Sequence, residues 1–392
     1  MEVAILGAGV AGLASAITLN RIGMAVRVFE RRESVHNLGA GVVCWPNATF
    51  VLSEIGILDE LCNVAGKITA MRRTTQHDVE LGTLNVRQLD AAMGFPSLAV
   101  LREDLMRVLL QRAEECKIPI TFNAHATAIE RTGDCCHVVF ADGTSISPTI
   151  IIGADGRMDS KARQYITNDS RPVYQGFVNW IGIHRWDQPQ FDCLEVRDYW
   201  GVGARFGVVP VSASTAYWAG GLAVPEQSLT RNRMPISQLK QTFDDWPAPV
   251  REIVRTASNT NTNTNTKCLA LFDHNPVRNW HRDHVLMIGD AAHAALPTSG
   301  QGVAQALEDA WFLAREFSAS PGDLENAMAN FTQKRLNKTT GIVMGGRAFA
   351  ASLFDTDAES CALRDRNAVE TDYNTMALGM ASAWSAGLPI GG

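Results

Sequence analysis

The sequence predicts a mixed α/β protein, and the first thirty residues carry that prediction. Val3–Leu6 is a short apolar run typical of a buried strand. The turn G-A-G-V-A-G at 7–12 leads into Leu13–Leu19, which has helical character, and Val26–Phe29 is a second strand that ends at Glu30. The order strand, G-x-G-x-x-G, helix, strand, acid is typical of a Rossmann-like unit that binds a dinucleotide.

Each residue type in this unit has a physical task. We expect Gly7 to make the tight turn, Gly9 to let backbone approach a pyrophosphate, and Gly12 to allow close packing of helix against strand. The N-terminus of the following helix favours a phosphate group. Glu30 can accept hydrogen bonds from a ribose diol. The motif alone leaves FAD and NAD open.

Length and composition exclude several classes of protein. The chain has 392 residues, 46% of them apolar, and a formal charge of −6. That length suggests two to three domains, and the apolar fraction excludes a disordered protein. The acidic balance argues against a nucleic-acid partner. Eight scattered cysteines without a C-x-x-C pair predict reduced thiols and a cytoplasmic protein. We find no signal peptide and expect no integral membrane segment.

Further glycine turns follow two more apolar runs. Ile150–Gly156 reads as a strand that meets G-A-D-G, and Leu286–His293 reads as a strand that ends in G-D-A-A-H. Gly300-Gln301-Gly302 then opens a helix over about 303–317. In this order the motifs resemble those of the single-component FAD-dependent aromatic hydroxylases related to para-hydroxybenzoate and salicylate hydroxylases. The resemblance covers roughly residues 1–350.

The family resemblance implies a Rossmann-like FAD-binding domain built from discontinuous segments, with an inserted substrate domain whose sheet is mostly antiparallel. The segments expected in the FAD-binding domain are 1–72, 98–170 and 268–350. Those expected in the substrate domain are 73–97 and 171–267. Residues 351–392 are expected to form a helical C-terminal segment and tail.

The resemblance also implies cofactor contacts. The pyrophosphate would lie by the first turn, the adenosine ribose by Glu30 and Arg31, the adenine by Ala126, and the flavin's pyrimidine edge by Gly300 to Ala304. The positions implied to contact FAD are Gly7, Gly9, Ala11, Gly12, Glu30, Arg31, Gly41, Val43, Arg102, Ala126, Asp155, Asp290, Pro297, Gly300, Gln301, Gly302, Val303 and Ala304.

The G-A-D-G segment departs from the family in one respect. The family has Ser and then Arg at fixed offsets after the second glycine. Here Ala162 stands at the usual arginine position, and Arg163 follows it by one. The family links this motif to both FAD and NAD(P)H, so NADH or NADPH is the expected co-substrate.

Arg205 is the only charged residue between residues 199 and 225. It reads either as an exposed or acid-paired arginine or as a cation that faces an anionic substrate. The neighbouring segments resemble bacterial FAD-dependent urate hydroxylases, which implies that Asn179, Arg205 and Tyr217 line the substrate site, with Arg205 and Tyr217 catalytic. The remaining positions implied to contact substrate are Leu296, Pro297 and Thr298. The urate enzymes have an acid where Thr298 stands, so a quinolone, pyridine or phenol is as consistent as a purine.

The predicted function is therefore hydroxylation of a small electron-rich aromatic or heteroaromatic compound with NAD(P)H and O₂ through a flavin C4a-hydroperoxide. A flavin-dependent oxidase or dehydrogenase without oxygen transfer is one alternative, and a non-catalytic FAD-binding module is another. The W-x-W-x-I-P segment of flavin-dependent halogenases is not found. We expect no metal site and a monomer or homodimer, and we expect His293 to be a packed, hydrogen-bonded histidine rather than a base.

Overall fold

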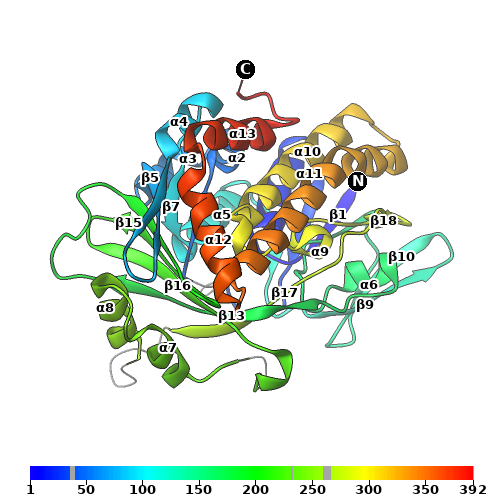
Figure 1. Ribbon diagram of the computed structural model, residues 1–392. Helices are drawn as coiled ribbons and strands as arrows, with labels where there is room; N and C mark the ends of the chain where they lie inside the picture. Colours follow the sequence, from blue (N-terminus) through cyan, green and yellow to red (C-terminus); the bar gives the residue numbers. More distant parts are fainter. Residues whose placement is uncertain (36–39, 231–232, 259–265, 392) are drawn as a thin grey trace.

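The computed structural model describes residues 1–391 except 36–39, 231–232 and 259–265. Figure 1 shows two large sheets with helices packed on both, which confirms the mixed α/β prediction. No helix in the described ranges has the length and apolar character needed to cross a lipid bilayer.

A six-stranded sheet holds the N-terminal unit. Strand β1 lies at its centre, parallel to β2 on one side and β12 on the other. Helices α1 (Val10–Arg21), α5 (Arg102–Glu115) and α10 (Gly302–Ala319) pack around it. The strands, in spatial order, are β18 (His281–Arg282), β19 (Val285–Met287), β12 (Ile150–Gly153), β1 (Glu2–Leu6), β2 (Ala25–Phe29) and β8 (Ile120–Thr121).

A seven-stranded sheet forms the second layer, and all its pairings are antiparallel except that of β14 with β5. Its strands, in spatial order, are β17 (Lys267–Asp273), β13 (Val173–Arg185), β16 (Thr215–Ala223), β15 (Ala204–Ser212), β14 (Glu195–Trp200), β5 (Ala70–Thr75) and β6 (Glu80–Asn85). The sheet thus joins chain segments from both parts expected in the substrate domain. It also contains β17, which was expected in the FAD-binding segment 268–350.

Alternation of side chains divides the seven-stranded sheet into two faces. One face carries Trp180, Phe206 and Trp218, which pack against α7 (Ile236–Phe243) and α8 (Ala248–Ala257). Because successive side chains point to opposite faces, Asn179, Arg205 and Tyr217 share the other face. The three polar residues expected at the substrate therefore lie on the side away from α7 and α8.

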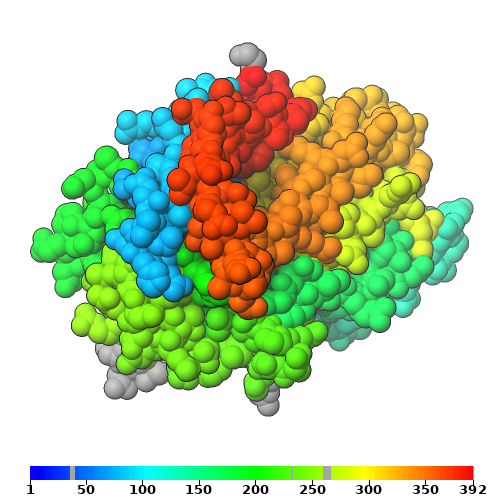
Figure 2. Space-filling view, in the orientation of Figure 1, coloured from blue at the N-terminus to red at the C-terminus, as the bar shows by residue number. Residues whose placement is uncertain are grey.

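Three helices close the C-terminal part of the chain: α11 (Leu324–Leu353), α12 (Ala358–Glu370) and α13 (Tyr373–Ser385). Helix α13 packs on β6 and on α4 (Val86–Met93), and α12 packs on β6 and α11. In Figure 2 α12 lies on the surface between α11 and the β5–β6 strands. The expected helical C-terminal segment is thus a cover over the edge of the substrate sheet.

The remaining elements connect these layers. Two small sheets contain β3 (Gly41–Cys44), β7 (Leu98–Leu101) and β4 (Gly66–Lys67), and β9 (Ala126–Thr132), β10 (Cys135–Phe140) and β11 (Ser145–Ile146). The short helices are α2 (Pro46–Glu54), α3 (Leu58–Cys62), α6 (Lys161–Thr167), α9 (Asp290–His293), η1 (Glu226–Ser228) and η2 (Pro297–Ser299).

Candidate active site

The glycine turn between β1 and α1 has the shape that the motif predicts. A Cβ on Gly7 would lie 2.3 Å from the Ala154 carbonyl oxygen, and one on Gly12 would lie 1.9 Å from the Gly7 oxygen. Both glycines are therefore needed for packing, and Gly7 also has a φ of +106°. A Cβ on Gly9 meets nothing within 4 Å. Gly9 thus marks the open side of the turn.

Glu30 lies at the end of β2 and is only 8% exposed. Its Oε2 accepts from the Ala8 N–H at 2.8 Å, and its Oε1 accepts from the Arg32 N–H at 3.0 Å. The Glu30 carbonyl accepts from the Ala124 N–H at 2.9 Å, which brings the chain before Ala126 alongside. The expected ribose and adenine positions are thus adjacent, and Arg31 is exposed beside them.

The G-D-A-A-H turn packs directly on the start of α1. Gly289 has a φ of +56°, and a Cβ there would lie 2.8 Å from the Ala11 Cβ. The next side chain, Asp290, accepts from Arg157 Nη2 at 2.7 Å and Nε at 3.1 Å. Burial opposes ionisation of Asp290, but the Arg157 guanidinium brings its pKa below the ordinary value. Asp290 therefore lies near the 7–12 glycine turn with its carboxylate already paired with Arg157.

The G-A-D-G segment fixes the start of α6. Asp155 accepts from the Ser160 hydroxyl and the Lys161 N–H, both at 2.6 Å, so its carboxylate serves as a helix cap. Arg163, only 4% exposed, donates to the carbonyls of Ala291 and Ala292. Arg163, and not Ala162, ties α6 to the G-D-A-A-H turn.

The candidate site has a cofactor half, around the glycine turns, and a substrate half, on the seven-stranded sheet. Arg102 lies between the two. The backbone N–H of Arg102 donates to the carbonyl of Ala40, just before β3, at 3.2 Å. The next residue, Gly41 of β3, pairs with Leu101 of β7. The Arg102 Nε is buried and has no hydrogen-bond partner among the described residues. Burial lowers the pKa of Arg102, an effect that the carboxylate of Asp290 opposes. A buried donor without a partner is costly, so it indicates a missing acceptor.

The turn before α10 presents the other predicted cofactor contacts. Gly300 has a φ of +64°, and its carbonyl accepts from Trp45 Nε1 at 2.9 Å. Helix α10 begins at Gly302 without an acidic residue in its first turn. The unpaired backbone N–H groups at this end favour a partial negative charge. Val303 and Ala304, two of the positions implied to contact the flavin edge, lie in that first turn.

Asn179, Gly221 and Arg205 lie in one row across strands β13, β16 and β15. A Cβ on Gly221 would lie 2.7 Å from Asn179 Oδ1, so the glycine leaves room for that amide. Arg205 Nε donates to Asp198 Oδ1 at 2.6 Å, and the other Asp198 oxygen accepts from Trp200 Nε1 at 2.9 Å. Of the two readings of Arg205, the acid-paired one is confirmed. Its Nη groups have no hydrogen-bond partner among the described residues.

Tyr217 joins the substrate face to the cofactor half of the site. Its ring packs so closely on β3 that a Cβ on Gly41 would lie 2.0 Å from the Tyr217 Cδ1. Burial raises the pKa of the Tyr217 phenol well above its ordinary value, and the nearby Cys44 adds to the shift. Its hydroxyl has no hydrogen-bond partner in the described part of the chain. Tyr217 therefore holds a neutral, unused donor beside strand β3.

Leu296, Pro297 and Thr298 lie between the G-D-A-A-H turn and α10. Leu296 is 1% exposed and belongs to the apolar cluster that contains Phe354. The Thr298 hydroxyl donates to the Gly346 carbonyl of α11 at 2.9 Å. This segment thus anchors the end of the expected pocket on helix α11, and the Thr298 hydroxyl is already engaged there.

Comparison with known proteins identifies the cofactor. A family described as "FAD binding domain" matches residues 1–322 of the chain. The chain belongs to this FAD-binding family. Among its relatives, "Aurachin C monooxygenase/isomerase" of Stigmatella aurantiaca is 28% identical over 351 residues, 88% of each chain. "FAD-dependent urate hydroxylase" of Mycolicibacterium vanbaalenii is 29% identical over 88% of this chain and 87% of its own.

A solved structure shows the same fold over the whole chain. Klebsiella pneumoniae HpxO complexed with FAD and uric acid superposes with a TM-score of 0.88 at 24% identity, covering 99% of this chain and 97% of its own. The likeness extends through the seven-stranded sheet and the C-terminal helices. The mixed α/β fold of an FAD-binding protein is therefore confirmed.

The described residues fit FAD on their own terms. The open side of Gly9 admits a pyrophosphate, Glu30 can hold a ribose hydroxyl with its free lone pairs, and Arg102 offers a donor without a partner. The backbone N–H groups at the start of α10 would suit the flavin edge. These four features come from segments that are far apart in the sequence and meet around β1 and β3.

Two residues of the candidate active site were missed from the sequence, one in its cofactor half and one in its substrate half. Arg157 pairs with Asp290, and Asp198 pairs with Arg205. Arg157 follows Gly156 directly, so its position in the G-A-D-G turn was an available signal. Nothing in the sequence distinguishes Asp198 from other acids, because its partner is selected by pairing of β14 with β15.

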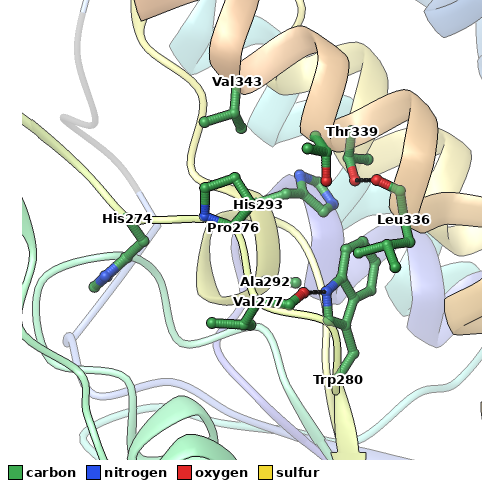
Figure 3. Close-up of a pocket in the computed structure, with 10 residues that line it drawn as sticks. His274, Pro276, Val277, Trp280, Ala292, His293, Leu336, Thr339 and Val343 are labelled. Carbon is green, nitrogen blue, oxygen red and sulfur yellow. Dashed lines mark hydrogen bonds between the residues drawn. The ribbon is translucent and has the colours of Figure 1, made fainter.

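Figure 3 shows the far side of the G-D-A-A-H turn. His293 points toward α11 beside Trp280, and a cavity of about 10 Å³ separates them from Thr339 and Val343. That volume suits a single water. His293 Nε2 lies 2.6 Å from Asp309 Oδ2, and the residue is 7% exposed. This is the packed, hydrogen-bonded histidine that the sequence predicted, and the cavity is too small for a substrate.

Proposed function

We propose that this protein is an FAD-dependent monooxygenase that hydroxylates a small electron-rich aromatic or heteroaromatic compound with NADH or NADPH and O₂. The observation that carries the proposal is the position of Tyr217. Its ring packs on Gly41 of β3, next to Arg102, while its strand pairs with the one that carries Arg205. A substrate on this face therefore lies against the flavin side of the site. The relatives named as monooxygenases and hydroxylases support the same activity.

Asn179, Arg205 and Tyr217 are proposed to bind and orient the substrate ring. Arg205 offers its Nη groups to an oxygen or nitrogen on the ring, and the neutral Tyr217 hydroxyl donates to a second position. Together they stabilise an ionised ring, which is more nucleophilic. FAD supplies the activation of O₂ when it is bound. The chain's task is then orientation and exclusion of water.

Water exclusion follows from how the site is covered. Phe354 lies over Gly221, and stacks on Phe177 with ring centroids 4.0 Å apart. Leu296 is buried in the same apolar cluster. A dry site matters because water would divert activated oxygen to H₂O₂.

The substrate class remains a proposal with four members: purine, quinolone, pyridine and phenol. Thr298 provides no carboxylate, and its hydroxyl is held by α11. The available polar groups are one amide, one guanidinium and one phenol. They suit a planar ring with two or three adjacent oxygen or nitrogen atoms.

The test is a panel of these four classes with purified protein. We expect bound FAD, NAD(P)H oxidation stimulated by at least one class, and a product that contains one atom from ¹⁸O₂. A compound that is itself oxidised without NAD(P)H, with no atom from ¹⁸O₂ in the product, would favour the oxidase or dehydrogenase alternative. The absence of stimulated oxidation with every class would favour the non-catalytic module.

We also propose a cytoplasmic monomer or homodimer. All eight cysteines are free thiols, as expected in a reducing compartment. Size-exclusion chromatography with light scattering distinguishes the two assemblies.

A further inference from the structure

Helix α10 carries two adjacent carboxylates, Glu308 and Asp309, that are completely buried. Arg335 of α11, also 0% exposed, bonds to both: its Nε donates to Asp309 Oδ1 at 2.8 Å and its Nη1 donates to Glu308 Oε2. A buried ionic cluster is expensive to assemble and sensitive to the loss of any member. The hydrogen bonds of this cluster to neighbouring segments therefore indicate which segments it holds in place.

The cluster holds both turns of the FAD site. Asp309 Oδ2 accepts from the Gly289 N–H at 2.8 Å and so fixes the G-D-A-A-H turn. Glu308 Oε1 accepts from Asn47 Nδ2 at 2.7 Å, and the same Asn47 nitrogen donates to Gln301 Oε1 at 2.9 Å. Through Gln301 the cluster reaches the residue before α10. One group of charges thus positions the Asp290 turn and the N–H groups proposed for the flavin edge.

Lys338 extends this cluster to the C-terminal segment. Its Nζ donates to Glu308 Oε1 at 2.9 Å, to the Trp384 carbonyl at 2.6 Å and to the Ala386 carbonyl at 3.2 Å. All three ammonium donors are used, and the side chain is 11% exposed. The carbonyls belong to the C-terminal end of α13, where a cation is favourable. One side chain therefore joins α13 to the charges behind the FAD site.

A second link runs between the same two places. The Trp384 ring packs on Trp45 with centroids 5.2 Å apart, and Trp45 Nε1 donates to the Gly300 carbonyl at 2.9 Å. Gly300 is the residue in the left-handed conformation that directs the chain into α10. The end of α13 thus touches the flavin turn through an aromatic pair as well as through Lys338.

We propose that Lys338 is a positioning residue for the flavin: it couples the docking of helix α13 to the geometry of the Gly300–Ala304 turn. The inference rests on the proposed placement of the flavin edge at that turn, and not on the identity of the substrate. When α13 is seated, the turn and the start of α10 are held against the flavin. When the Lys338 contacts are lost, the N–H groups at this end are less well aimed, and the reduced, negatively charged flavin is the more affected form.

The test compares Lys338→Met, Lys338→Arg and a matched control, Lys334→Met. Lys334 lies one turn earlier on α11 and also pairs with a buried acid of α10, Glu316, but it does not reach α13. Three quantities are measured on the FAD-loaded full chain without substrate: the Kd for FAD, the midpoint potential of the bound flavin, and hydrogen exchange of 373–385.

Lys338→Met is expected to raise the Kd for FAD about tenfold, to lower the midpoint potential, and to speed exchange in 373–385. Lys338→Arg should restore all three, and Lys334→Met should leave them near the parent values. Trp384→Leu, which breaks the aromatic link without a change of charge, should shift the potential in the same direction as Lys338→Met. Trp384→Leu also provides the test of the proposal if Lys338→Met does not fold.

Two results would overturn the proposal. Faster exchange in 373–385 with an unchanged Kd and potential would show that α13 and the flavin turn are independent. Equal effects of Lys334→Met and Lys338→Met would show a general loosening of the α10–α11 pair. Because no measurement requires substrate, a failure here is distinguishable from failure of the proposed hydroxylation, which the substrate panel tests.

Discussion

Arg205 Nε donates to Asp198 Oδ1 at 2.6 Å, so the one cation in a long uncharged stretch enters the site as half of an ion pair. Asp198 is 2% exposed and also holds Trp200. It therefore fixes the orientation of the guanidinium fork, whose Nη groups have no hydrogen-bond partner among the described residues. Asp198 offsets part of the positive charge of Arg205, and the Nη groups of Arg205 remain hydrogen-bond donors with a fixed direction.

The first prediction is that Asp198→Asn weakens substrate binding without direct contact with substrate. Arg205 loses its charged partner and the fixed direction of its fork, so we expect the substrate KM to rise several-fold. Loss of a buried charge-assisted hydrogen bond should also lower the free energy of unfolding by about 1–3 kcal/mol. Steady-state kinetics and urea unfolding check both. An unchanged KM in a destabilised variant would mean that Arg205 has no role in the site.

The second prediction concerns Tyr217→Phe. The hydroxyl has no partner in the described part of the chain, so its removal breaks no internal hydrogen bond, and the stability should change by less than about 0.5 kcal/mol. We nevertheless expect a larger fraction of consumed NAD(P)H to appear as H₂O₂, because the ring is no longer oriented. Burial raises the pKa of this phenol, so no break from Tyr217 should appear in the activity profile below pH 10. An unchanged H₂O₂ fraction would remove Tyr217 from the site.

The cofactor half of the site was predictable because its residues act through local turns. Gly7, Gly9 and Gly12 are recognisable by spacing, and their steric roles match that spacing. Asp290 and the start of α10 follow from glycine turns after strands. The roles of Ala162 and Arg163 required the structure, because the sequence departs from the family's spacing and leaves open which side chain faces the G-D-A-A-H turn.

The substrate half was less predictable because its contacts depend on strand register. Asn179 and Arg205 become neighbours only because both strands pair with β16 at Gly221. Asp198 carries no motif, and the sheet alone places it beside Arg205. The C-terminal helices have little motif content, yet Trp384 reaches Trp45 across more than three hundred residues of sequence. Such contacts are set by packing of apolar faces, which a single sequence leaves open.

The third prediction concerns acid stability and Asp309. Burial opposes ionisation of this carboxylate, but His293 and Arg335 hold its pKa below the ordinary value. A carboxyl whose folded pKa is depressed stabilises the fold above its unfolded pKa of about 3.9, and that stability is lost as the pH falls through the folded value. We expect stability to decline below about pH 4. Asp309→Asn should cost about 3–5 kcal/mol at pH 7, because Arg335 loses a buried partner.

Urea unfolding of both proteins from pH 7 down to pH 3 checks this prediction. The difference in unfolding free energy between parent and Asp309→Asn should shrink as the pH falls, because the parent carboxylate becomes protonated. Because asparagine has nearly the same shape as aspartate, the comparison measures the effect of the Asp309 charge. A difference that stays constant over the whole range would show that the Asp309 charge does not stabilise the fold.

The fourth prediction separates FAD binding from folding with two neighbouring glycines. A Cβ on Gly9 meets nothing within 4 Å of protein, so Gly9→Ala should fold with nearly the parent stability. The methyl group would project from the open side of the turn, where the pyrophosphate must approach the backbone. We therefore expect weaker FAD binding, with a Kd increased by at least about tenfold, and little change in the thermal midpoint of the apoprotein.

Gly12→Ala provides the contrast. Its Cβ would lie 1.9 Å from the Gly7 oxygen, so α1 must move away from the turn, and both stability and FAD binding should fall. FAD fluorescence titration and thermal unfolding of the two apoproteins distinguish the cases. Gly9→Ala with unchanged FAD affinity would mean that the pyrophosphate does not lie on the open side of this turn. Equal destabilisation by both variants would mean that Gly9 serves packing and not the cofactor.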